Sequence, residues 1–114
     1  MPLMDATLRA LADPNRREIL RLIRDEELPA GRIASRFRVT RPAISQHLSV
    51  LRQAGLLTER RDGTRRLYLA RREGAAEVRA WLDAFWDDGL DRLRAAAERE
   101  AMGQETRDEH DDRR

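Results

Sequence analysis

The fold follows from residues 40–57, which read TRPAISQHLSVLRQAGLL. Thr40 is a favourable N-cap and Pro42 is tolerated in a first helical turn, while Gly55 is a typical residue just past a helix end. A helix is therefore predicted over residues 41–54. Its apolar residues recur at helical spacing and predict one face turned toward a core: Ile44, Leu48 and Leu51.

The opposite face of this predicted helix is polar and contains no acid. It carries two cations, two hydroxyls, two amides and a proline: Arg41, Pro42, Ser45, Gln46, Ser49, Arg52 and Gln53. Such side chains can meet base edges and phosphates in the major groove of duplex DNA. The alternative is an ordinary solvent-facing helix. Such helices usually mix acids with bases, however, and no acid occurs between Thr40 and Thr58.

The residues just before this helix predict its structural partner. A short helix is expected from Ala30 to Phe37, and a tight turn at Arg38 and Val39 would join the two helices into a helix-turn-helix unit. Arg38 and the capping residue Thr40 complete the candidate DNA contacts at this end of the unit. His47 lies beside the core-facing residues, where it either forms a local hydrogen bond or reaches a phosphate, and we include it among the candidates.

Two further helices are predicted nearer the N-terminus. Residues 4–12 carry apolar side chains at helical spacing: Met4, Leu8 and Leu11. Asp13 and Pro14 then form the N-cap and first position of a helix that runs to about Arg24, where the Leu28-Pro29 pair soon interrupts the pattern.

A β-hairpin is predicted directly after the helix-turn-helix. Residues 56–61 and 65–70 are strand-like runs on either side of Asp62-Gly63, a turn signal. Four arginines surround that turn: Arg60, Arg61, Arg65 and Arg66. They would repel one another unless anions offset their charge, and DNA phosphates do so. The alternative is that these charges only keep an edge hairpin soluble.

A long helix is predicted beyond Gly74, with a broad apolar stripe that contains both tryptophans: Val78, Trp81, Leu82, Phe85, Trp86, Leu90 and Leu93. A core this small cannot cover such a stripe within one chain, so we expect a homodimer interface there. Leu8 and Leu11 of the first helix are expected to join it. A pocket for an effector lined by the aromatics is the alternative. Residues 98–114 are polar and aperiodic, which predicts a disordered tail after a folded domain of residues 1–97.

The charges are unevenly distributed along the 114 residues. The net charge is −1 over residues 1–31, +9 over residues 32–72 and −6 over residues 73–114. A basic block between neutral and acidic flanks is typical of a nucleic-acid footprint. The chain lacks cysteine, a long apolar run and a secretory signal. The composition therefore predicts a cytoplasmic protein with no disulfide, no membrane segment and no thiolate metal site.

Taken together, these elements predict a mainly α-helical winged helix-turn-helix of the α+β class, with five helices and a two-stranded wing before the last helix. No catalytic centre is expected, because the chain has no glycine-rich phosphate loop and no plausible nucleophile–base arrangement. No metal is expected either, since His47 has no second histidine near it. The other histidine, His110, lies in the polar tail.

Three segments resemble the ArsR/SmtB family of bacterial repressors: ALADPNRREIL at residues 10–20, RPAISQHL at residues 41–48 and LRQAGLL at residues 51–57. The resemblance implies a dimer formed by the first and last helices, a recognition helix in the major groove of an imperfect palindrome, and a location on the bacterial nucleoid. Metal-sensing members carry cysteine pairs near the third helix, or histidine and carboxylate ligands on the last helix. This chain has no cysteine, and its last helix has carboxylates but no histidine: Asp83, Asp87, Asp88 and Asp91. It is therefore similar to a branch that works as metal-independent autorepressors, with no cofactor.

A different class of function remains open from the sequence. A winged helix can also act as a protein-interaction module, in which case the arginine block would bind an acidic protein partner. Neither the residues nor the resemblance identifies a small-molecule effector.

Overall fold

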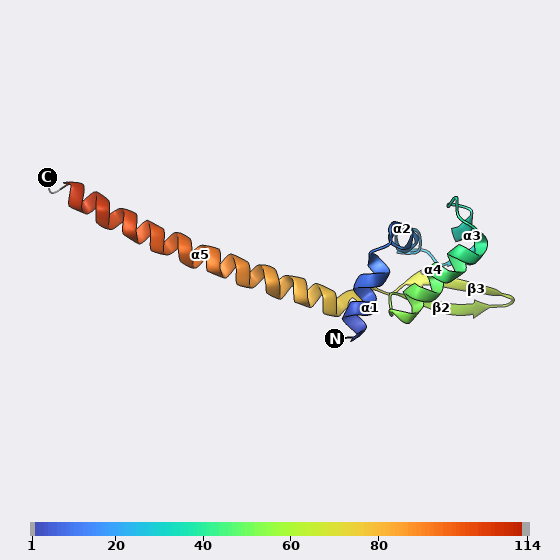
Figure 1. The fold of residues 1–114 in the computed structure, drawn as a ribbon. Coiled ribbons are helices and arrows are strands. Elements are labelled where there is room, and N and C mark those ends of the chain that lie inside the picture. Colours follow the sequence, from blue (N-terminus) through green and yellow to red (C-terminus); the bar gives the residue numbers. More distant parts are fainter. Residues whose placement is uncertain (1, 113–114) are drawn as a thin grey trace. The chain divides into compact units, whose positions relative to one another are not determined.

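The computed structural model describes the backbone of residues 2–112 and the side chains of residues 4–103 (Figure 1). In chain order the elements are α1 (Pro2–Leu11), α2 (Pro14–Leu22), β1 (Leu28–Pro29), α3 (Ala30–Ala34), α4 (Arg41–Gln53), β2 (Leu57–Asp62), β3 (Arg65–Ala70), the 3-10 helix η1 (Arg72–Ala75) and α5 (Ala76–Asp112). This order, with five α-helices in the described range and a hairpin before the last, confirms the predicted fold class. The chain divides into two compact units, Met1–Arg79 and Ala80–Arg114.

Helices α2 and α4 begin at the side-chain caps that the sequence predicts. The Asp13 carboxylate accepts hydrogen bonds from the backbone N–H groups of Asn15 at 2.7 Å and Arg16 at 3.2 Å. Thr40 Oγ1 accepts one from the N–H of Ala43 at 3.2 Å. Each bond satisfies an N–H that the helix itself leaves without a partner.

The C-terminus of α4 is closed by Gly55, which turns the chain toward the hairpin. Gly55 has a φ of +76°, a conformation that other residues adopt only with strain. Its N–H donates to the Arg52 carbonyl, and the N–H of Leu56 donates to the Leu51 carbonyl, each at 3.0 Å. These two bonds form a Schellman motif, so the predicted helix end is placed to within one residue.

Helix α3 is shorter than predicted, because residues 35–37 follow it as tight turns. The N–H groups of Arg36 and Phe37 donate to carbonyls three residues earlier instead of four. Ser35 Oγ donates to the Arg32 carbonyl at 2.7 Å and so competes with regular helix at this point. The link between α3 and α4 is therefore longer than the two-residue turn predicted at Arg38 and Val39.

The sheet has three strands in the order β1-β3-β2, all antiparallel. The hairpin register pairs Leu57 with Ala70 and Asp62 with Arg65. Strand β1 was not expected, since Leu28 and Pro29 were predicted only to interrupt the preceding pattern. It forms because the chain that follows α2 returns alongside β3, where Leu28 pairs with Tyr68.

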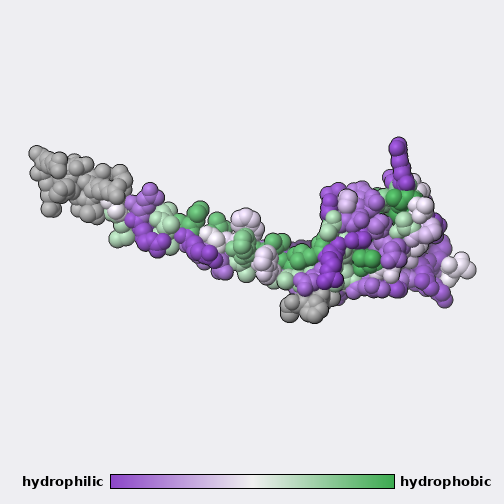
Figure 2. Space-filling model, viewed as in Figure 1, coloured by the Kyte–Doolittle hydropathy of each residue, from purple (hydrophilic) through white to green (hydrophobic). Residues whose placement is uncertain are grey.

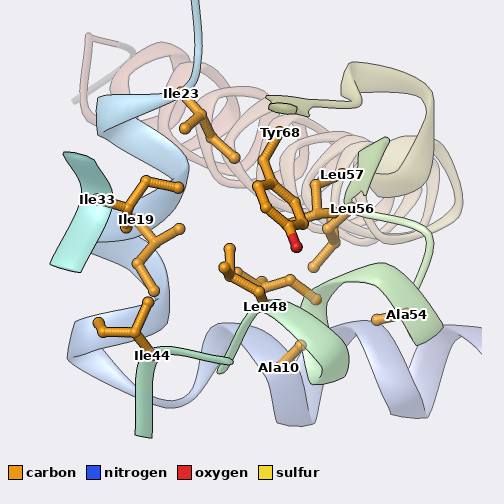
Figure 3. Close-up of a cluster of buried hydrophobic side chains, with 11 residues drawn as sticks. Ala10, Ile19, Ile23, Ile33, Ile44, Leu48, Ala54, Leu56, Leu57 and Tyr68 are labelled. Carbon is orange, nitrogen blue, oxygen red and sulfur yellow. The ribbon is translucent and has the colours of Figure 1, made fainter. Parts of the chain in front are cut away.

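The core of residues 1–79 brings together side chains from α2, α3, α4 and the sheet (Figure 3). The fully covered members include Ile19, Ile23, Ile33, Ile44 and Leu51, each at 0% exposure. Tyr68 projects from β3 into the same cluster and is only 9% exposed. The predicted inner faces of α2 and α4 therefore meet in one core, which fixes the outward direction of the polar face of α4.

Helix α5 continues past the position where the sequence predicts a tail. The element runs from Ala76 to Asp112 without a break. The two compact units meet at Arg79 and Ala80, and the folded domain of residues 1–97 stays a prediction. Figure 2 shows apolar and hydrophilic residues interspersed along this helix. Disorder of residues 98–114 stays a prediction.

Candidate nucleic-acid interface

The outer face of α4 is open to solvent in the structure. Arg41, Pro42, Ser45, Gln46 and Arg52 are exposed, and Ser49 is half-buried. The inner residues of the same helix are fixed in the core, with Ile44 at 0% and Leu48 at 3% exposure. The helix therefore presents an acid-free polar surface on a rigid support, as a groove-reading helix requires.

The two candidates that precede α4 differ in role. Thr40 is exposed, but its hydroxyl oxygen is engaged as the helix cap. Arg38 is exposed in the link between α3 and α4. The guanidinium of Arg38 can therefore reach a phosphate, whereas the hydroxyl oxygen of Thr40 is already used within the helix.

The hairpin ends in a two-residue turn at Gly63 and Thr64, one residue later than the predicted turn at Asp62-Gly63. Gly63 has a φ of +64°, and Thr64 has no positive φ, which is the pattern of a type II′ turn. This turn type matches the twist of the flanking strands and holds the tip of the hairpin in a defined direction.

The four hairpin arginines lie on two faces of the hairpin. Arg61 pairs directly with Arg66 across the strands, on the same face as Glu59 and Tyr68, because alternate residues of a strand share a face. Since Tyr68 enters the core beside α4, this face is the one turned toward α4. Arg60 and Arg65 alternate with these residues and occupy the other face.

Three of these arginines already have acidic partners within the chain. Arg60 Nε donates to Glu27 Oε2 at 2.6 Å, and Arg65 lies 3.5 Å from Asp62. Arg66 Nη1 lies 3.1 Å from Glu59 Oε1. Arg61 forms no ion pair within the part of the chain whose side chains are described. The predicted repulsion between the arginines is therefore partly relieved inside the protein, and Arg61 keeps its full charge for an outside anion.

Glu59 is a functional candidate that sequence reasoning missed. Its second oxygen, Oε2, accepts a hydrogen bond from Arg52 Nη1 of α4 at 2.9 Å. Burial and the nearby Glu59 charge raise the pKa of Tyr68, which sits opposite Glu59 in the hairpin. One signal was present in the sequence: residues 32–72 contain only two acids, Glu59 and Asp62, among eleven arginines.

Three hollows lie between α4 and the hairpin, and two of them are lined by Ser45 of α4. One, of about 190 Å³, is lined by residues of both elements, among them Ser45, Arg52 and Glu59. The other, of about 380 Å³, lies toward the hairpin tip and is lined by Arg41, Arg65 and neighbouring residues. The structure thus gathers most of the predicted α4 and hairpin residues around one surface.

His47 points toward the N-terminal helices and not toward that surface. Its Nδ1 lies 3.4 Å from Arg16 Nη1, and since arginine can only donate, Nδ1 is the acceptor when this bond forms. Arg16 also donates to the carbonyls of Arg9 and Ala10 at the end of α1. Of the two roles predicted for His47, the local hydrogen bond is the one that the geometry favours.

The predicted dimer residues on α5 are exposed. Trp81 and Phe85 are each 54% exposed and stack with ring centroids 5.5 Å apart, and Trp86 meets Phe85 edge-on at the same distance. Leu82, Leu90 and Leu93 are exposed as well. On α1, Leu8 is 48% exposed, whereas Leu11 is half-buried against the core of its own chain.

Two other kinds of site are absent from the described residues. These residues contain no group of three or more histidine, aspartate or glutamate side chains that could hold a metal ion. No helix in that part of the chain is long and apolar enough to cross a membrane.

Comparisons with known proteins agree with this geometry. A helix-turn-helix domain family model matches residues 11–60. The HTH-type transcriptional regulator Rv2034 of Mycobacterium tuberculosis is 43% identical over 86 residues, which are 75% of this chain and 80% of the relative. The transcriptional repressor SdpR of Bacillus subtilis is 40% identical over 60 residues, 53% of this chain and 67% of the relative.

A solved structure shares the fold. It is the homodimeric winged helix-turn-helix DNA-binding domain of a possible ArsR-family transcriptional regulator from Mycobacterium bovis. It superposes with a TM-score of 0.61 at 29% identity and covers 78% of this chain and 82% of that one.

These likenesses decide between the two functions that the sequence left open. DNA binding is confirmed, and the alternative of a module for acidic proteins is set aside. The prediction that the protein is not an enzyme is confirmed too, because its relatives are transcriptional regulators. The chain belongs to the ArsR/SmtB family of winged helix-turn-helix, DNA-binding transcriptional regulators.

Proposed function

We propose that this protein is a homodimeric repressor that reads an imperfect palindrome through α4 and works without sensing a metal. The observation that carries the proposal is the exposed, acid-free face of α4 beside an arginine-rich hairpin. Gln46 and Ser45 lie mid-face, where they reach base edges, and Arg61 is the hairpin cation with its charge unpaired. In a two-fold dimer the recognition helices lie about one DNA turn apart, roughly 34–36 Å.

The dimer is proposed to form through the apolar stripe of α5 together with Leu8 of α1. Burial of large side chains such as Trp81, Phe85 and Trp86 is favourable, and this free energy is not gained while they face water. A second copy of the chain carries an identical apolar surface, and a two-fold arrangement covers both stripes at once.

Repression is proposed because a dimer bound across a promoter excludes the polymerase from the same DNA. The relative SdpR, a transcriptional repressor, supports this direction of regulation. The first duplex to test is the region upstream of the protein's own gene, since autorepression is the mode that the family resemblance suggests.

Metal independence rests on the donor set of the chain. Cysteine is absent, and His47 is the only histidine before the polar tail, so a usual four-ligand zinc site cannot be assembled from the folded part. Titration with zinc, nickel or cadmium should leave DNA affinity unchanged when followed by fluorescence anisotropy. Release of DNA at a stoichiometric, sub-micromolar metal concentration would contradict this proposal.

The decisive experiment separates specificity from electrostatic attraction. Gln46→Ala should weaken binding to the preferred duplex by about 1–3 kcal/mol and relax the preference at one position in each half-site. Arg61→Ala should weaken the preferred duplex and a shuffled duplex alike, and reduce the slope of log affinity against log salt by about one. Fluorescence anisotropy at several salt concentrations measures both effects.

Gln53→Ala is the matched control, because Gln53 is exposed on the same helix but lies in its last turn. It should weaken binding to the preferred duplex much less than Gln46→Ala does, because the N-terminal part of a recognition helix, and not its last turn, contacts base edges. The assignment of α4 as recognition helix would be wrong if Gln46→Ala weakened the shuffled duplex as much as the preferred one.

A further inference from the structure

Glu59 is an acid on a surface that otherwise suits an anionic ligand. Its side chain is only 16% exposed, and its two oxygens are divided between two elements. Oε2 lies 2.9 Å from Arg52 Nη1, in the last turn of α4, and Oε1 lies 3.1 Å from Arg66 Nη1, on β3. We name these three residues the Glu59 clamp. It joins the recognition helix to the hairpin through charged side chains.

The other acid of the basic block is arranged differently. Asp62 lies near the hairpin tip, and among the residues whose side chains are described it pairs with Arg65 alone, at 3.5 Å and within the same hairpin. Both side chains of that pair are more than half exposed, so water screens the interaction. Asp62 therefore does not link the hairpin to any other part of the fold, whereas Glu59 is covered and holds two cations at once. A carboxylate with such cover is tolerated because both oxygens are paired.

We propose that Glu59 is a positioning residue for DNA recognition, which holds the hairpin against the end of α4 and aims Arg52 and Arg66 at the phosphates beside the recognition helix. The inference rests on the proposed role of α4 as the helix that reads DNA. Glu59 itself does not touch DNA in this arrangement, because it lies beneath the two guanidinium groups.

The geometry leaves both arginines able to bind DNA while they are held. A guanidinium has five N–H donors; Arg52 gives one of them to Glu59 in a hydrogen bond, and Arg66 is held to Glu59 by an ion pair. The arginine side chains remain 52% and 58% exposed, so their other donors face solvent. An arginine that is already oriented loses less conformational freedom when it meets a phosphate at the matching position.

The negative charge of Glu59 also acts against indiscriminate binding. It removes one unit of positive charge from the surface and so weakens the sequence-independent attraction to any duplex. Specificity is a difference of affinities, and lowering the affinity for wrong DNA raises it as effectively as improving the contacts to the right one. Glu59 thus favours discrimination over total affinity.

The test compares Glu59→Gln with Asp62→Asn, two substitutions that each remove one carboxylate charge from the hairpin. The probes are a duplex of about 30 base pairs selected by the wild-type protein from a random pool, and a shuffled duplex of equal composition. Both variants should bind the shuffled duplex more tightly. Only Glu59→Gln should lower the ratio of selected to shuffled affinity, by about fivefold or more, because phosphate contacts fix the register of α4 on the duplex and a lost register costs at least one good base contact.

A second variant separates position from charge. Glu59→Asp keeps the charge, but its shorter side chain cannot reach both guanidinium groups, so the affinity ratio should fall without tighter binding to the shuffled duplex. The thermal midpoint should stay close to wild type in all three variants, because both arginines are more than half exposed and water screens their ion pairs with Glu59. A clamp that served only stability would lower the midpoint and both affinities together.

A readout without DNA keeps this inference distinct from the proposed function. In the free protein, the guanidinium Nη–H signals of Arg52 and Arg66 in nitrogen-15 NMR spectra should shift in Glu59→Gln and stay in place in Asp62→Asn. Unshifted signals, or equal affinity ratios for Glu59→Gln and Asp62→Asn, would overturn the clamp. A wild-type protein that did not discriminate between duplexes would overturn the proposed function, while the NMR signals would still report whether Glu59 holds the two arginines.

Discussion

Helices α4 and α5 both carry an apolar stripe at helical spacing, yet the two stripes end in opposite environments. On α4 the stripe residues Ile44, Leu48 and Leu51 are at most 3% exposed. On α5 the corresponding residues, such as Trp86 and Leu93, are 62% and 70% exposed. An amphipathic pattern therefore shows which side of a helix tends to be buried, but not whether that side packs against residues of the same chain.

The difference has an energetic consequence. Burying a large apolar side chain stabilises by about 1.5–3 kcal/mol relative to leaving it in water. Residues 1–79 collect this stabilisation within one chain, so we expect them to hold their fold whether or not a partner is bound. The large apolar residues of α5 from Ala80 onward do not gain it while they are exposed.

The largest effect is expected from opening a cavity in the core. Ile44→Ala removes a side chain of 0% exposure and should lower the free energy of unfolding by about 2–5 kcal/mol, measured by urea titration. Gln53→Ala, on the exposed face of the same helix, should change it by less than about 0.5 kcal/mol. Equal losses from the two substitutions would show that α4 is not anchored as the structure has it.

A somewhat smaller effect is expected from the aromatic residues of α5. The double substitution Trp81→Ser with Phe85→Ser should raise the dimer dissociation constant at least about hundredfold, because aromatic side chains dominate interface energetics. Analytical ultracentrifugation measures the association, and circular dichroism checks that residues 1–79 stay folded. The dimer proposal fails if the wild-type protein is itself a monomer at about 50 μM.

The smallest of these effects concerns the cap of α2. Asp13→Ala should cost about 1 kcal/mol at pH 7, since it leaves the N–H groups of Asn15 and Arg16 without their acceptor. Asp13→Asn keeps an acceptor and should cost much less. Thermal unfolding of the three proteins at matched pH gives the comparison.

The same cap has a defined dependence on pH. Burial acts to raise the pKa of Asp13, but the backbone hydrogen bonds and the charges of His47 and Arg16 outweigh it, so the pKa lies below its usual 3.8. A lowered pKa in the folded state means that the stabilisation is complete above the unfolded value and is lost as pH falls through the folded one. The gap between wild type and Asp13→Ala should therefore close in strong acid, and a gap that widened there would contradict the cap.

Local chemistry explains which parts of the fold could be predicted. The caps at Asp13 and Thr40, the glycine stop at Gly55 and the hairpin follow from interactions within a few residues. Strand β1 and the short α3 could not be predicted, because β1 depends on pairing with β3 some forty residues later and α3 is shortened by turn bonds that compete closely with helix.

The candidate interface divides in the same way. The outward residues of α4 follow from its periodicity, and the hairpin arginines follow from their position around a turn. The separation of those arginines onto two faces follows from the pairing register of the two strands. Alternation of apolar and polar residues cannot fix that register where no residue near the turn is apolar. Glu59 was missed because its partners, Arg52 and Arg66, are brought to its two oxygens by folding.

By itself, the sequence determined that this chain is a helix-turn-helix regulator with a basic hairpin and no thiolate chemistry, because periodicity, caps and residue inventory are properties of short segments. Only the tertiary structure decided that His47 turns toward Arg16, that Arg60 is paired with Glu27 while Arg61 is not, and that Glu59 joins α4 to the hairpin. These outcomes depend on distances between residues far apart in the chain, and the packing of the core around Ile44 and Tyr68 sets those distances.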